Sequence, residues 1–109
     1  MGFDSYYYEF TTIAEADIDE TLTYIEENLS NPDAATKFAD NFEARIEEIC
    51  KKPKTGLLVD NPFLKRNDVR RFLVDNYIAY YIIDDEKNRI IILRVVYGKR
   101  DQDRILRDL

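Results

Sequence analysis

Arginine, lysine and tyrosine carry most of the polar chemistry that this sequence offers. Arg70 and Arg71 are adjacent in a β-rich run, so their side chains point to opposite faces and one of them must share the face that the sheet exposes. Arg94 lies between apolar neighbours, and Tyr97-Gly98-Lys99-Arg100 closes the same run. Such a set can bind phosphates, stack bases and stabilise the charge of a phosphodiester transition state. Alternatively, Arg71 or Arg94 forms ion pairs with acids of the helices, and the residues alone leave both interpretations open.

The composition excludes several other kinds of chemistry. The chain has no histidine, which removes Ser-His-Asp and Cys-His catalysis and most zinc sites. Three scattered glycines do not make a phosphate-binding loop, and no carboxylate pair has the spacing of a metal or glycosidase site. We therefore expect no metal and no cofactor. The single Cys50 is expected to be a small buried hydrophobe, because no histidine is present to activate its thiol.

Charge is divided unevenly along the chain. The net charge is −6, but residues 1–50 hold 2 basic and 13 acidic residues, a net of −11, and residues 51–109 hold 14 basic and 9 acidic residues, a net of +5. The acids of the first half are expected to lie on solvated helix faces. The second half could still present a basic surface to an anionic partner.

Length and sorting signals indicate a cytoplasmic protein. The 109 residues fit a single domain over residues 1–109. No apolar run approaches the ~18 residues of a membrane helix, so we expect no membrane partner. The first ten residues, MGFDSYYYEF, lack the basic and apolar regions of a secretory signal. A lone cysteine suits a reducing compartment.

The first half predicts a strand followed by two helices. Alternating aromatic residues predict a strand over about residues 5–11, and Thr12 with Glu15 matches a capping box that begins a helix. Asn31 and Pro32 start a second helix that runs to about Lys52, and the short link makes the pair an antiparallel hairpin. The apolar stripes that follow the helical period are Ala14, Ile18, Leu22, Ile25 and Leu29 in the first helix, and Ala35, Phe38, Phe42, Ile46 and Ile49 in the second.

The second half predicts an antiparallel meander. Residues 54–68 form a loop, residues 69–74, 77–83 and 89–97 are β-rich, and turns lie at 75–76 and 84–88. The helical hairpin must cover one face of this sheet. The other face is then covered by a partner or left as an aromatic, basic concavity. The tail over residues 101–109 forms a last helical turn or an arm.

This order of elements, together with four motifs, resembles the RelE/ParE family of toxins from bacterial type II toxin–antitoxin modules, a group that includes plasmid-stabilisation toxins. The resemblance covers about residues 6–106, and its motifs are Ala16-Asp17-Ile18-Asp19 with Tyr24-Ile25, Asn31-Pro32-Asp33-Ala34-Ala35, Asp75-Asn76-Tyr77-Ile78-Ala79-Tyr80-Tyr81, and Ile92 to Asp101. It implies an α+β fold of order β-α-α-β-β-β, with a helical hairpin packed on a small antiparallel sheet. It also implies a cognate antitoxin whose C-terminal segment wraps the toxin and covers its active surface.

The resemblance further implies a target and a set of site residues. RelE-like members are mRNA interferases that cleave mRNA on the ribosome, and ParE-like members inhibit DNA gyrase. Arg100 matches a position that is catalytic in RelE-like toxins, Arg71 falls near a basic strand position, and Tyr97 is a substitute for a tail tyrosine. In an RNA-cleaving toxin the other basic residues, Arg70, Arg94 and Lys99, would bind the RNA.

Two positions depart from the RelE-like pattern. Ile78 stands where RelE-like toxins have another arginine, and Leu106 stands where the tail tyrosine would lie. The sequence therefore leaves ribosome and gyrase open as targets, and with them whether the chain is an enzyme. A non-toxic module that only binds an antitoxin and contributes to transcriptional repression is the alternative.

Overall fold

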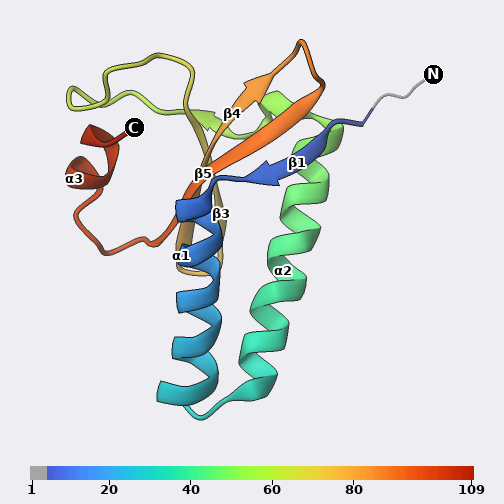
Figure 1. Cartoon of the computed structure of the whole chain (residues 1–109), viewed down its shortest axis with the longest axis vertical. Coiled ribbons are helices and arrows are strands. Elements are labelled where there is room, and N and C mark those ends of the chain that lie inside the picture. The colour runs from blue at the N-terminus through green and yellow to red at the C-terminus, as the bar shows by residue number, and fades with distance from the viewer. Residues whose placement is uncertain (1–4) are drawn as a thin grey trace.

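The computed structural model describes residues 5–109; the first four residues, part of the segment in which we expect no secretory signal, lie outside this range. The helices are α1 (Thr12–Thr23), α2 (Pro32–Lys51) and α3 (Gln102–Arg107), with a π-helical turn η1 (Tyr24–Asn28) after α1 and a 3-10 turn η2 (Pro53–Thr55) after α2. The strands are β1 (Tyr7–Phe10), β2 (Leu57–Leu58), β3 (Arg70–Val74), β4 (Tyr77–Asp84) and β5 (Arg89–Tyr97). The hairpin of α1 and α2 covers one side of the sheet and extends beyond it (Figure 1).

The predicted meander of β3, β4 and β5 is confirmed. The sheet order is β1-β5-β4-β3-β2, and all neighbours are antiparallel except β1, which runs parallel to β5. Asp75 and Asn88, in the two turns of the meander, adopt the positive φ angles that aspartate and asparagine tolerate. The sheet is mixed because the helical hairpin carries the chain away from β1, and the last strand returns beside it. The loop predicted over residues 54–68 contains the short strand β2, which sequence patterning did not predict.

The helices begin close to the predicted residues. Thr11, and not Thr12, caps α1, because its hydroxyl accepts a hydrogen bond from the Ala14 N–H at 3.1 Å. Asn31 caps α2 as predicted, with Pro32 in its first turn. All five predicted stripe residues of α2 are buried. The stripe of α1 is confirmed only in part, since Leu29 is 55% exposed.

The sheet has an apolar core on each side. On the helix side, Phe38 and Phe42 of α2 pack against Phe72 and Tyr81 of the sheet. On the other side, α3 and the loop after β2 cover β4 and β5, and the buried residues there are Val69, Ile78, Tyr80, Val96, Ile105 and Leu106. The expectation of a second face left open or covered by a partner is therefore wrong over these strands. The predicted helical turn of the tail is α3 itself, which lies on the other side of the sheet from α2 (Figure 1) and buries its own Ile105 and Leu106 there.

Candidate functional site

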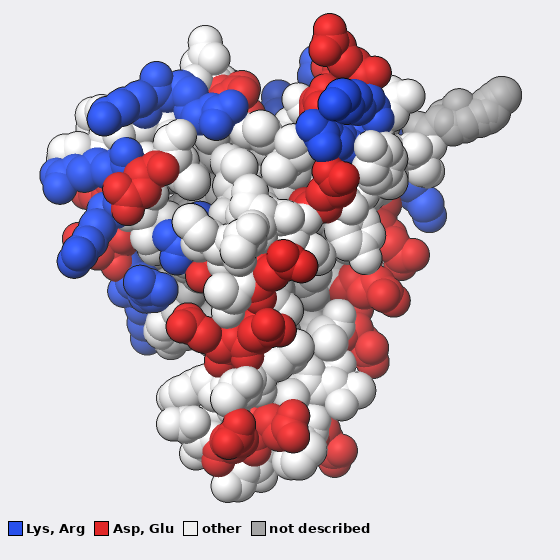
Figure 2. Space-filling model, viewed as in Figure 1, with Lys and Arg blue, Asp and Glu red and all other residues white. Residues whose placement is uncertain are grey.

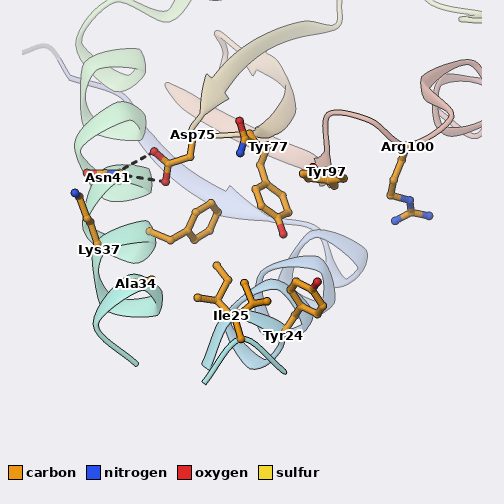
Figure 3. A pocket seen from close by; sticks show the side chains of 12 residues that line it. Tyr24, Ile25, Ala34, Lys37, Asn41, Asp75, Tyr77, Tyr97 and Arg100 are labelled. Atoms are coloured by element: carbon orange, nitrogen blue, oxygen red, sulfur yellow. Dashed lines mark hydrogen bonds between the residues drawn. The ribbon is translucent and has the colours of Figure 1, made fainter. Parts of the chain in front are cut away.

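A groove lies between the helical hairpin and the ends of the sheet strands (Figure 3). It has a volume of about 730 Å³. A row of aromatic rings runs along it from α2 to the end of β5, with centroids 5.1 Å apart between Phe38 of α2 and Tyr77 of β4 and 5.6 Å apart between Tyr77 and Tyr97 of β5. Tyr24 and Ile25 of η1 form the opposite side. We call this hollow the aromatic groove.

The turn η1 explains why two consecutive residues of the first helix reach this groove. The Leu29 N–H bonds to the carbonyl of Tyr24, five residues earlier, at 3.2 Å, which widens the last turn of the helix. Such π-turns are rare and often occur at functional sites. Here the turn presents Tyr24 and Ile25 to the groove.

Charged groups lie at the two ends of the aromatic groove. Lys37 of α2 lies at one end, and Arg100, just after β5, lies at the other (Figure 3). Between them, the Asn41 side-chain amide donates to the Asp75 carboxylate at 3.2 Å, which ties α2 to the turn between β3 and β4. The arrangement offers apolar and aromatic contact with a cation at each end.

Arg94, predicted to bind RNA, is engaged inside the fold. Its guanidinium donates to both carboxylate oxygens of Asp17 in α1, from Nε at 2.8 Å and from Nη2 at 3.2 Å. The hydrogen bond that Arg94 donates to Asp17 is the main cause that raises the pKa of Arg94 above its ordinary value. The ion-pair alternative left open by the sequence is therefore the arrangement observed for Arg94.

The remaining predicted residues do not gather in one place. Arg100 and Tyr97 meet in the aromatic groove. Arg71 stands opposite Tyr80, on the sheet face that α3 covers, because its neighbour Phe72 points to the helices. Arg70 lies on the helix side and donates to the Gly56 carbonyl at 2.8 Å. Lys99 lines a separate, smaller hollow beyond the turn between β3 and β4.

Ile78, at the position where the resemblance expects an arginine of RelE-like toxins, is 7% exposed. It packs with Tyr80 and Val96 of the sheet and with Ile105 and Leu106 of α3. Leu106, which stands in place of the tail tyrosine, belongs to the same cluster. Both departures from the RelE-like pattern are thus parts of one apolar core.

Sequence reasoning missed several residues around the site. Lys37 and the ring of Tyr77 were not assigned to a site, although both line the groove. Asp17 was also missed as a buried acid, and a signal for it existed. Asp17 lies between Ala14 and Thr21 at steps of three and four residues, so it falls on the inward face of α1.

The surface repeats the charge division of the sequence. In the view of Figure 2, acidic side chains are spread over the helical hairpin, and basic side chains gather around α3 and the loop beside it. Within residues 5–109, no helix is long and apolar enough to cross a membrane. Over the same residues, no group of three His, Cys, Asp or Glu side chains is placed to hold a metal ion.

The fold of this chain is that of the RelE/ParE toxins. The toxin–antitoxin complex RelBE2 from Mycobacterium tuberculosis is similar with a TM-score of 0.63 and 22% identity, covering 88% of this chain and 94% of that chain. The chromosomal ParDE system from P. aeruginosa has a TM-score of 0.68 and 18% identity, covering 87% and 98%. The isolated E. coli toxin RelE has a TM-score of 0.57 and 17% identity, covering 96% and 100%.

A comparison with protein families is more specific than the comparison of folds. Residues 8–102 match the model of the ParE toxin of type II toxin–antitoxin systems, parDE. The chain therefore belongs to the ParE toxin family. Its class of function is that of the toxin of a type II toxin–antitoxin module, with a cognate antitoxin as partner. No curated protein matches the sequence.

Proposed function

We propose that this chain arrests bacterial growth by inhibiting DNA gyrase, in the manner of ParE-like toxins, and that its cognate antitoxin neutralises it. The observation that carries the proposal is the burial of Ile78. The RelE-like toxins, which cleave RNA, resemble this chain but have an arginine at that position. Here the position is filled by an isoleucine under α3.

The positions of the other cations support the same choice. Stabilising a phosphodiester transition state requires several donors aimed at one group in a preorganised site. Arg100 lies in the aromatic groove, Arg71 lies on the opposite face of the sheet, and the charge of Arg94 is matched by Asp17. Tyr97 packs edge-on against Tyr77 at the groove wall. These side chains therefore form no cluster around one phosphate.

The experiment that tests this proposal is dual labelling in a bacterium that lacks the antitoxin. After induction, methionine and thymidine incorporation are followed in the same culture. We expect thymidine incorporation to fall first, and the purified protein to inhibit supercoiling by gyrase in vitro. If methionine incorporation falls first, the ribosome is the target and the proposal is wrong. If neither falls while soluble protein accumulates, the chain is a non-toxic module that binds its antitoxin.

Arg100 supplies a sharper test of the mechanism. Under the gyrase proposal Arg100 is a contact group at one end of the groove and not a catalytic group, so we expect the Arg100→Ala protein to stay folded and to arrest growth more weakly without losing the activity. The matched control is Arg104→Ala, another exposed arginine that lies on α3 outside the groove. Complete loss of growth arrest in a folded Arg100→Ala protein, with the control still active, would restore RNA cleavage as the mechanism.

A further inference from the structure

The strand β5 is longer than the strand that pairs with its outer edge. Residues 7–10 of β1 pair with residues 89–92 of β5, and the chain then turns into α1. Thr11 makes the last contacts of this turn, since its N–H donates to the Ile92 carbonyl and its hydroxyl donates to the Leu93 carbonyl, both at 3.0 Å. Within residues 5–109, no strand pairs with the outer edge of β5 beyond Leu93.

Asp17 lies about one and a half turns into α1, and its side chain covers this unpaired edge of β5. Its Oδ2 accepts the backbone N–H of Val95 at 2.9 Å and the Nε of Arg94 at 2.8 Å. Its Oδ1 accepts the Nη2 of Arg94 at 3.2 Å. The side chain of Asp17 is 7% exposed, so three hydrogen bonds replace the water that this carboxylate has lost.

The same face of α1 continues from Asp17 into the functional site. Thr21 and Tyr24 follow at steps of four and three residues, so they lie above Asp17 along the helix. Together with Asp17 they line a hollow of about 160 Å³ whose opposite wall includes Tyr97 and Arg100. The position of this helix face thus sets the spacing between Tyr24 and the end of β5.

We propose that Asp17 is a positioning residue that docks α1 on the unpaired edge of β5 and thereby holds one wall of the aromatic groove against Tyr97 and Arg100. The effect of Asp17 on growth arrest rests on the function proposed above. Its effect on the position of α1 rests only on its contacts with Arg94 and Val95.

A carboxylate is required because its two partners are both donors. An asparagine at position 17 could still accept the Val95 N–H through its oxygen, but its amide would bring N–H groups towards the Arg94 guanidinium. The buried arginine would then lack an anion. The Asp17→Asn variant therefore releases α1 from β5, whereas the double variant Asp17→Asn with Arg94→Gln removes the charge and restores a donor–acceptor pair.

The geometric test measures the distance from α1 to the end of β5. Spin labels are placed on cysteines at the exposed positions Asp19 and Lys99, in a Cys50→Ala background, and their separation is measured by electron paramagnetic resonance. The control is Ile46→Val, which weakens the fully buried core on α2 without changing the contacts of Asp17 with Arg94 and Val95. All proteins are compared at the same fraction folded, so that stability alone does not decide the result.

We expect a narrow distance distribution in the wild type and in Ile46→Val, a broadened or shifted one in Asp17→Asn, and recovery in the double variant. In cells, Asp17→Asn should lose most of its growth arrest at equal soluble level, while Ile46→Val keeps it. An unchanged distribution in Asp17→Asn, or equal broadening in Ile46→Val, would overturn the positioning role. If the wild type itself does not arrest growth, the proposed function fails, and the distance measurement still decides the role of Asp17.

Discussion

Replacing Leu106 by alanine tests whether α3 is a fixed part of the fold. The helix has six residues, which is far too short to be stable in water by itself. It must therefore be held by docking. Leu106 is 2% exposed in the apolar cluster on that side of the sheet. The helix is also joined to the rest of the chain by hydrogen bonds from Tyr80 to Gln102 at 2.6 Å and from Asn61 to Asp103 at 2.9 Å.

The expected cost follows from the buried volume that the substitution removes. Truncating a buried leucine to alanine costs about 2–5 kcal/mol in measured proteins. Domains of this size have a total stability of roughly 5–15 kcal/mol, so the loss would be a large part of it. Urea unfolding followed by circular dichroism measures the change, with Leu57→Ala as control. Leu57 is 65% exposed, and its truncation should change the free energy of unfolding by no more than about 0.5 kcal/mol.

A small effect would refute the reasoning behind the proposed function. If Leu106→Ala costs less than about 1 kcal/mol, Leu106 is not buried in solution as described, and α3 does not hold the sheet face closed. The position of Ile78 would then be accessible, and its burial could no longer argue against RNA cleavage. Limited proteolysis gives an independent reading, because a loosely held α3 would be cut in the wild type under native conditions.

Three further predictions concern the core. Tyr81→Phe should cost about 1–3 kcal/mol in urea unfolding, because the Gly56 N–H and the Pro53 carbonyl both lose their partner. Burial raises the pKa of Tyr80 and of Tyr81 above the ordinary value of 10.0. Their neutral forms therefore stabilise the fold fully below that pH, and this stabilisation is lost as the pH rises through the folded-state pKa values. The melting temperature should fall in a thermal-unfolding series into the alkaline range, and an unchanged melting temperature would contradict the prediction. Burial also raises the pKa of the Cys50 thiol, so a thiol reagent should label Cys50 only after unfolding, and rapid labelling of the native protein would disprove its burial.

Elements with strong periodicity could be predicted from the sequence. The stripe of α2 follows the helical period over five residues, and a capping asparagine and a proline mark its start, so both its extent and its buried face are confirmed. The meander is likewise marked by β-rich runs with turn residues between them. The strand β2 has no such signal, since two leucines in a polar loop become a strand only through pairing with β3.

The sequence could predict which site residues meet when they are close together in the chain. It could not predict which face of the sheet a residue occupies, because that depends on the strand register. Tyr97 and Arg100 are three residues apart, and they do meet in one groove. Which of Arg70 and Arg71 faces the helices depends on a register that a shift of one residue reverses. The covering of the second sheet face was mispredicted, because the tail DQDRILRDL has too few apolar residues to signal a docked helix.

The pairing of β1 with β5 has a consequence for the timing of synthesis. Tyr7 pairs with Arg89, and Asp17 with Arg94, so the first strand and the first helix find their partners only near the end of the chain. Contacts of such long sequence separation close late in folding. While β5 is still inside the ribosome, the nascent chain has neither its central strand nor the end of the aromatic groove. The central strand and the end of the aromatic groove therefore form only once β5 has emerged from the ribosome, although β1 and α1 are made first.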